Sequence, residues 1–213
     1  MTSHKGMVIV LSGFSGAGKG TIMKHLLNKY PKDYFLSISA TTRGIRQGEV
    51  DGREYFFKTK EEFEQMIADH QLLEYASFND NYYGTPKAYV EKLVNEGKDV
   101  ILEIEVQGAL QIKKIFPESL LLFVTPPSAA TLKERLLVRG TETLDVIEQR
   151  LSIAKKESLL MNQYDYLVVN DVLDDAVEHV HQIIQSEHFQ TSRNIDNINN
   201  IQEDLNQFLK GDL

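Results

Sequence analysis

The sequence contains no cysteine, no long apolar run and no excess of positive charge. Without cysteine, disulfides and thiolate metal sites are excluded, and we expect a cytoplasmic protein. The apolar run nearest to the N-terminus, residues 7–11, is too short for a signal peptide or a membrane span. The 31 acidic and 23 basic side chains give a formal net charge of −8, which disfavours a nucleic-acid partner. A phosphate group must therefore be bound by cations that gather locally.

Four short apolar runs predict an α/β fold. They are residues 8–12, 100–106, 120–125 and 166–170, and a segment with helical spacing follows each of them. Continuously apolar runs are typical of parallel strands that are buried on both faces. We therefore expect a parallel sheet flanked by helices, with no internal repeat.

Two insertions interrupt this pattern. Residues 35–58 and 72–78 are rich in Phe, Tyr, Ile and Thr, which predicts a small, mostly β insertion. The one helix of this insertion begins at a capping box, Thr59 to Glu62. The insertion ends at Thr85-Pro86, which resembles the start of a further helix that stops at Gly97.

The second insertion is helical. Residues 126–128 start a helix that Gly140 ends, and a longer helix follows at 144–161. The polar tail has Ile and Leu near helical spacing, so it is either a loosely held amphipathic helix or disordered. The predicted division is a core of 1–34, 98–126 and 162–187, the β insertion at 35–97, the helical insertion at 127–161 and a tail at 188–213.

Residues 13–21, GFSGAGKGT, match the pattern G-x-x-x-x-G-K between a strand and a helix. Successive amides at a helix N-terminus bind a phosphate anion, and Lys19 can reach it. Gly20 stands where most such loops place a hydroxyl on Mg²⁺, so we expect phosphates and waters to hold the metal and assign no side chain to it. Nucleotide binding is assigned to Gly13, Phe14, Ser15, Gly16, Ala17, Gly18, Lys19, Gly20 and Thr21.

A second cationic cluster predicts a site for the acceptor. Arg43 and Arg46 lie three residues apart and Tyr55 follows, and two guanidinium groups with a phenol can surround one phosphate monoester. A carboxylate beside a hydroxyl would select guanine, whose edge offers two donors next to an acceptor. The candidate carboxylates are Glu74 and Glu105, and the candidate hydroxyls are Ser39 and Thr85.

The sequence resembles the guanylate kinases, within the P-loop nucleoside monophosphate kinases, over residues 6 to about 187. The P-loop alone resembles that of adenylate kinases, and the more specific motifs lie downstream. They are TTRGIRQGEVDGREYFF (41–57), LEYA (73–76), NYYGTP (81–86), LEIEVQGA (102–109), PPS (126–128), RLLVRGTET (135–143) and YDYLVVND (164–171).

The resemblance implies a kinase that uses ATP and Mg²⁺ to phosphorylate GMP, and also dGMP. It places Ser39, Glu74, Thr85 and Glu105 on guanine, and Arg43, Arg46, Tyr55 and Tyr83 on the GMP phosphate. Arg135 and Arg139 share one face of the predicted lid helix, and with Arg150 they would close over the triphosphate. Asn170 would lie near the donor adenine. Stabilisation of the charge that develops during phosphoryl transfer is assigned to Lys19, Arg43, Arg135, Arg139 and Arg150.

Three positions depart from the family pattern. The family usually has Asp where Glu105 stands, Pro where Ile45 stands and Ser where Gly20 stands. Two other readings stay open: a different nucleoside monophosphate kinase, and a non-catalytic interaction module with the same fold. A monomer and a homodimer are both compatible with the sequence, and no membrane partner is expected.

Overall fold

The computed structural model describes residues 5–78, 80–138 and 143–209. Its centre is a parallel sheet with the strand order β2-β7-β1-β8-β9. The strands are β1 (Val8–Gly13), β2 (Tyr34–Leu36), β7 (Asp99–Glu103), β8 (Leu120–Thr125) and β9 (Tyr166–Val169). The apolar runs therefore form the parallel sheet that was predicted from them. The run at 100–106 is strand only as far as Glu103, and a helix takes over soon afterwards.

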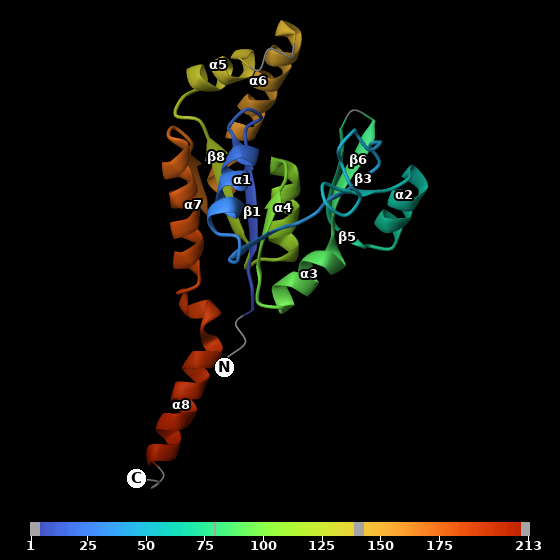
Figure 1. Cartoon of the computed structure of the whole chain (residues 1–213). Helices are drawn as coiled ribbons and strands as arrows, with labels where there is room; N and C mark the ends of the chain where they lie inside the picture. The colour runs from blue at the N-terminus through green and yellow to red at the C-terminus, as the bar shows by residue number, and fades with distance from the viewer. Residues whose placement is uncertain (1–4, 79, 139–142, 210–213) are drawn as a thin grey trace.

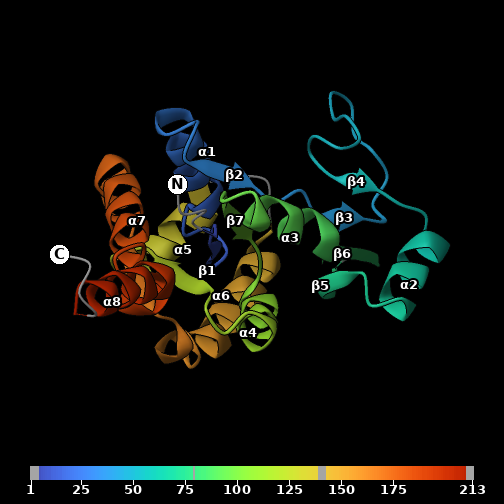
Figure 2. The same cartoon turned by 90° about the horizontal axis from the view of Figure 1, so that it is seen from below.

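Helices cover both faces of this sheet (Figures 1 and 2). Because side chains alternate along a strand, Ile9 and Leu11 of β1 pack on one side and Val8 and Val10 on the other. The first side is covered by α1 (Lys19–Lys29) and α7 (Leu173–Glu187), the second by α3 (Lys87–Asn95) and α4 (Val106–Ile115). All six residues of β1 are buried, so the strand that leads into the phosphate loop is fixed from every direction.

A second, smaller sheet forms an arm beside the body (Figure 1). Its strand order is β4-β3-β6-β5, and α2 (Lys60–Ala68) packs its fully buried Phe63 against it. The strands are β3 (Ala40–Thr41), β4 (Phe56–Phe57), β5 (Leu72–Phe78) and β6 (Asn81–Pro86). The capping box at Thr59 and Glu62 is confirmed.

The predicted helix start at Thr85 is wrong. Thr85 belongs to β6, which pairs with β5 as far as Leu72 and Pro86, and α3 begins only at Lys87. Strand pairing therefore overrides the local preference of a Thr-Pro sequence for a helix N-terminus. Segment 35–97 also contributes to the large sheet, because part of β2 pairs there and α3 covers it.

Two helices stand above the carboxyl ends of the large sheet, and one extends below it (Figure 1). The upper pair is α5 (Ala129–Val138) and α6 (Leu144–Ser158), and a 3-10 turn at Met161–Gln163 follows the shorter than predicted α6. The predicted end of α5 at Gly140 lies outside the described residues. The tail was predicted to be either an amphipathic helix or disordered, and it forms the helix α8 (Ile195–Leu209). Among the described helices, none has the length and apolar character that crossing a membrane requires.

Candidate active site

The phosphate loop is built between the buried strand β1 and the first turn of α1. Gly18 precedes the helix at φ 94°, a left-handed conformation that glycine adopts without strain. The Lys19 ammonium lies back across the loop and donates to the carbonyls of Gly13 and Phe14 at 2.7 and 3.3 Å. The loop therefore keeps its cation within reach of any anion that the amides would bind.

Arg135 of α5 and Asn170, which follows β9, also contact this loop. Asn170 Nδ2 donates to the Ala17 carbonyl at 2.8 Å, and Arg135 donates to the Asn170 carbonyl at 2.9 Å. A Cβ on Gly18 would lie 2.4 Å from Asn170 Nδ2, so this contact requires glycine at that position. A loop, a strand end and a helix of the upper insertion therefore meet at one point.

The upper helices place two arginines over the loop because their apolar sides pack against the body. Leu132 and Leu136 of α5 are buried, and so are Ile147 and Ala154 of α6. Arg150, between the last two, donates to the hydroxyl of Ser15 in the loop. Together with Arg135 it adds positive charge to a loop that already holds Lys19.

The arm carries a separate cationic group. Arg43 binds Glu49 through two hydrogen bonds, at 2.8 and 3.1 Å, and its guanidinium lies 5.3 Å from the centre of the Tyr55 ring. The rings of Tyr55 and Tyr83 are 6.0 Å apart. Arg43 holds the pKa of the Glu49 carboxyl below its usual value, so this pair stays ionised. One guanidinium and two phenols therefore converge on the same part of the arm.

Glu74 is a buried carboxylate at the base of the arm. It is 6% exposed, and Thr85 donates its hydroxyl to Glu74 Oε1 at 2.6 Å. Its other oxygen approaches α4 so closely that a Cβ on Gly108 would lie only 2.7 Å away. Burial raises the pKa of Glu74, and the bond from Thr85 partly opposes this shift. No cation of the described residues forms an ion pair with Glu74, and burying a carboxylate in this way is costly, which makes Glu74 a candidate to bind a ligand.

Two further carboxylates lie at the end of β7. Glu105 is the N-cap residue of α4 and is exposed to solvent. Glu103 ends the strand next to the phosphate loop, and a Cβ on Gly20 would lie 3.4 Å from its Oε1. Desolvation by the surrounding protein raises the pKa of the Glu103 carboxyl, although the residue is exposed to solvent. The nearby ammonium of Lys19 opposes this shift.

Comparison with known proteins identifies the family. A model described as guanylate kinase matches residues 5–187. The chain is 55% identical over 193 residues to a guanylate kinase of Bacillus anthracis, covering 91% of this chain and 94% of that protein. The chain belongs to the guanylate kinase family.

More distant guanylate kinases agree in sequence and in fold. The protein of Streptococcus thermophilus (strain CNRZ 1066) is 48% identical over 202 residues, covering 95% of this chain and 97% of that one. The crystal structure of guanylate kinase from Anaplasma phagocytophilum superimposes with a TM-score of 0.72 at 29% identity, covering 91% of this chain and 92% of that one. The P-loop kinase fold with a parallel sheet core is thereby established.

Most residues that the guanylate kinase pattern predicted fall into two groups. The phosphate loop, Arg135, Arg150 and Asn170 form the first, and Arg43, Tyr55 and Tyr83 belong to the second. The side chain of Arg46 is exposed, and its backbone amide donates to Glu49 at 2.8 Å. Arg139 lies outside the described residues.

Three residues that contact the predicted site residues were not assigned a role from the sequence. Glu49 orients Arg43, and Gly108 gives Glu74 the space it occupies. Glu103 faces the loop position where Gly20 replaces the usual Ser. An acidic residue near the end of the strand next to the phosphate-loop strand is a common partner of Mg²⁺ in these folds, but this signal does not distinguish Glu103 from Glu105.

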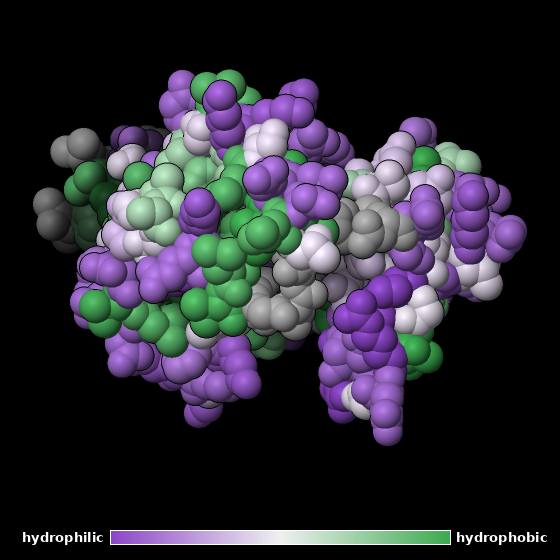
Figure 3. Space-filling view, turned by 90° about the horizontal axis from the view of Figure 1, so that it is seen from above, coloured by the Kyte–Doolittle hydropathy of each residue, from purple (hydrophilic) through white to green (hydrophobic). Residues whose placement is uncertain are grey.

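Seen from above, the body and the arm are two lobes with a notch between them along one edge (Figure 3). The loop group belongs to the body, and the Arg43 group belongs to the arm. Polar residues predominate on the arm in this view. The candidate site therefore has two cationic groups that belong to separate lobes.

Proposed function

We propose that this protein transfers the terminal phosphoryl group of ATP to GMP, and that dGMP also serves as acceptor. The proposal rests above all on Glu74, a buried carboxylate in the lobe opposite the phosphate loop. A carboxylate there accepts from the N1–H and N2–H₂ groups of guanine and repels the N1 lone pair of adenine. The acceptor is therefore a guanine nucleotide.

Ser39 is the hydroxyl available to donate to guanine O6. The Thr85 hydroxyl already donates to Glu74, so its role is to orient the carboxylate. Ser39 is half-buried and its hydroxyl makes no hydrogen bond with the described residues. Glu105 is exposed at the start of α4. It stands where the family usually has Asp, so its longer side chain would make the corresponding contact with guanine.

The Arg43 group binds the phosphate of GMP. A guanidinium held by Glu49 and two phenols present several donors to one dianion. In the opposite lobe, the loop amides and Lys19 bind the donor phosphates, with Arg135 and Arg150 above them. A phosphate oxygen of GMP is already nucleophilic, so in-line transfer needs positioning and positive charge but no general base.

Closure of the two lobes would complete this mechanism. An oxygen of GMP attacks the γ-phosphorus of ATP while the bond to the β-phosphate oxygen breaks, and ADP leaves. Lys19 and the two upper arginines offset the charge that develops on the transferred group. A closed site also excludes water, which limits hydrolysis of ATP.

An acceptor panel tests the proposed specificity. With ATP as donor, we expect rapid turnover of GMP and dGMP. AMP should be at least about 10⁴-fold poorer in kcat/KM, because it would leave buried polar groups unpaired. UMP should be similarly poor. A coupled assay of ADP release measures all four, and comparable rates with AMP and GMP would contradict the assignment of Glu74.

The residues around the loop also fit a magnesium ion. Mg²⁺ in such sites is held by phosphates, waters and one or two carboxylates. Glu103 is the carboxylate that faces Gly20, where a hydroxyl would otherwise stand. No group of three or more metal-binding side chains occurs among the described residues, so the phosphates would supply most ligands. The ion would neutralise charge on the transferring phosphate.

Replacing Glu103 by glutamine should raise the Mg²⁺ concentration needed for half-maximal activity by about 10-fold or more. The substitution keeps the shape of the side chain but removes its charge. Glu64→Gln, on the exposed surface of α2, is the matched control and should leave the titration unchanged. Identical Mg²⁺ titrations for Glu103→Gln and wild type would exclude Glu103 from the metal site.

A further inference from the structure

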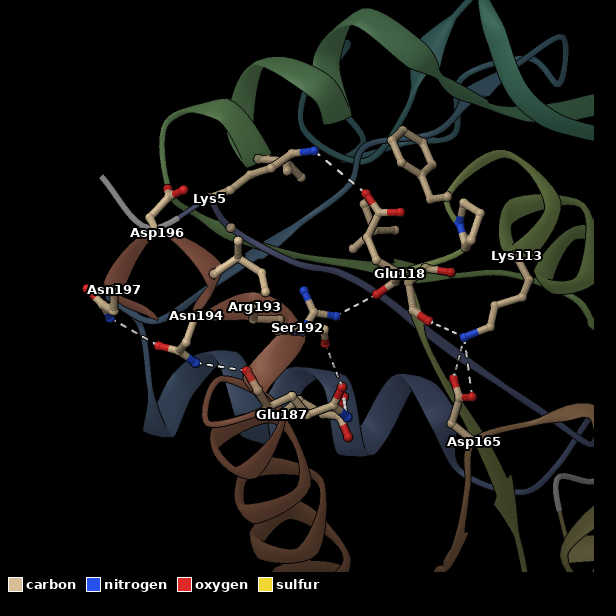
Figure 4. Close-up of a pocket in the computed structure, with 18 of the residues that line it drawn as sticks. Lys5, Lys113, Glu118, Asp165, Glu187, Ser192, Arg193, Asn194, Asp196 and Asn197 are labelled. Atoms are coloured by element: carbon tan, nitrogen blue, oxygen red, sulfur yellow. Dashed lines mark hydrogen bonds and ion pairs between the residues drawn. The ribbon is translucent and has the colours of Figure 1, made fainter. Parts of the chain in front are cut away.

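Two pockets at the amino ends of the large-sheet strands meet at one arginine. Arg193 lies in the 3-10 turn Thr191–Arg193, between α7 and the tail helix α8, and lines both of them. The larger pocket, of about 790 Å³, is bordered by α8 (Figure 4). The smaller one, of about 610 Å³, is bordered by the segments that lead into β2 and β7. Nucleotides in open α/β sheets bind at the carboxyl ends of the strands, so neither pocket is part of the active site.

Charge distinguishes the two pockets. The larger one is lined by three cations and four carboxylates, which disfavours an anion. The smaller one is lined by only two carboxylates and by four cations: Lys5, Lys32, Lys98 and Arg193. The chain as a whole has a formal net charge of −8, so this excess of positive charge is local. Such a concentration of one sign of charge in a concave surface attracts an anion.

Two of these four cations have no counterion. Lys5 and Lys98 each pair with an acid, at 3.6 and 2.5 Å, whereas Arg193 and Lys32 form no ion pair with the described residues. Nη2 of Arg193 donates to the Glu118 carbonyl, and its Nε is buried without a hydrogen-bond partner (Figure 4). Arg193 is half-buried, and a partly buried charge without a counterion is costly. An anion in the smaller pocket would supply that counterion.

The acids of the smaller pocket do not cancel its cations. Asp99 is buried and already bound: its Oδ1 accepts from the Met7 amide at 3.0 Å, and its Oδ2 lies 2.6 Å from Nε2 of His188. Asp99 raises the pKa of His188, so the ring keeps its proton to higher pH and offsets the charge of Asp99. Asp33 is exposed to water, which weakens the effect of its charge. An anion in this pocket would therefore face a net positive charge.

Two phenyl rings give the smaller pocket an apolar part. The ammonium of Lys98 lies 4.8 Å from the centre of the Phe35 ring, and Phe189 is 84% exposed. Phe189 follows α7, and the carbonyls at the end of that helix would repel an anion. Asn194 donates to one of these carbonyls, that of His188, at 2.9 Å. The pocket therefore combines cations with an exposed aromatic side chain that a ligand would cover.

We propose that the smaller pocket binds a phosphate group through Arg193 and Lys32. Guanidinium and ammonium groups form charge-assisted hydrogen bonds with phosphate oxygens, and a dianion gains from several cations at once. The phosphate has two possible sources, inorganic phosphate or a phosphate monoester whose organic part packs on Phe189. The site shares no residue with the phosphate loop or the Arg43 group, so it does not depend on the proposed transfer reaction.

Amide NMR spectra of the ¹⁵N-labelled full chain test this site, because they report on each residue separately. Ionic strength is held constant with NaCl, so that screening does not change during the titration. With ADP present, inorganic phosphate should shift the amides of Gly97 and Phe189, which line the pocket, while Gly16 and Gly18 report on the phosphate loop. We expect a dissociation constant of about 1 mM, as for a small ion held by few groups. Unshifted amides of Gly97 and Phe189 at about 20 mM phosphate would overturn the proposal.

Two variants test the proposed contacts. Arg193→Gln should weaken phosphate binding by about 10-fold or more, because a charge-assisted contact is lost. This change also affects the bond to the Glu118 carbonyl, so Lys32→Gln, at an exposed position, is a second test and should weaken binding by about 3-fold. Lys60→Gln removes the same charge from the exposed surface of α2 and should bind phosphate as wild type does. Wild-type affinity in either Arg193→Gln or Lys32→Gln would contradict the proposed contacts.

Phenyl phosphate distinguishes the two sources. Binding at least about 3-fold tighter than that of inorganic phosphate would assign the pocket to a monoester, because the added ring packs on Phe189. Equal or weaker binding would assign it to free phosphate. Phe189→Ala, at an exposed position, should remove any preference for phenyl phosphate and leave the affinity for inorganic phosphate unchanged. A preference that survived Phe189→Ala would contradict the packing of a ligand on this ring.

Discussion

Replacing Glu74 by glutamine should abolish the use of GMP and at the same time stabilise the folded protein at pH 8. We expect kcat/KM for GMP to fall by about 10³–10⁴-fold, because the new amide places a donor against the donors of guanine. The side chain keeps its size, so the arm should stay folded. Steady-state kinetics with GMP and thermal unfolding of the same preparation measure the two effects.

The stability change has a defined pH dependence. Burial raises the pKa of Glu74 in the folded state above its ordinary value of 4.5, so at pH values between these two pKa values the folded protein holds a proton that the unfolded chain releases. The stability of wild type therefore falls as pH rises through that raised pKa, and glutamine escapes this loss. The advantage of Glu74→Gln should be largest at pH 8 and should disappear below pH about 4, where both states of wild type are protonated.

Glu91→Gln is the matched control for this substitution. Glu91 lies on the exposed surface of α3, where it pairs with Lys87 at 3.8 Å. Its replacement should change neither the use of GMP nor the pH profile of stability. If Glu74→Gln retained GMP activity within tenfold of wild type, the carboxylate would not contact guanine.

Replacing Lys19 by methionine should reduce kcat by at least about 10²–10³-fold, the usual effect of removing one preorganised group that stabilises developing charge. Methionine keeps most of the length of the side chain but cannot donate. The folded protein loses two hydrogen bonds within the loop, from Lys19 to the carbonyls of Gly13 and Phe14, which does not involve the core. Activity should therefore fall without unfolding.

GMP binding separates this effect from a general loss of structure. Lys19 belongs to the loop and the proposed GMP contacts belong to the arm, so the dissociation constant of GMP by calorimetry should stay within about twofold of wild type. Lys24→Met is the control, because Lys24 is an exposed residue on the same helix, α1. A Lys19→Met enzyme with kcat within tenfold of wild type would remove Lys19 from the transfer step.

The phosphate loop and the large sheet could be predicted from the sequence because their signals are local. A strand, a loop and a helix follow one another within residues 8–29, and each apolar run forms a strand of the sheet. The family motifs added the residues of the arm, which lie far apart along the chain. Their grouping depends on strand pairing, such as that between β3 and β6, which composition does not show.

The features that escaped prediction depend on contacts between distant residues. Thr85 resembles a helix start until its pairing in β6 and its bond to Glu74 are known. Glu74 and Gly108 are far apart along the chain and touch only because α4 packs beside β5. Acidic residues alternate at 103 and 105, and the sequence does not show which one faces the loop.

The burial of β1 and the short length of two arm strands bear on which part of the protein would move during catalysis. β1 is buried along its whole length and carries the donor loop, whereas β3 and β4 have only two residues each. Bending should therefore cost less around β3 and β4 than along β1. ATP would be kept in a stationary frame, and the acceptor would be carried toward it by the lobe that moves.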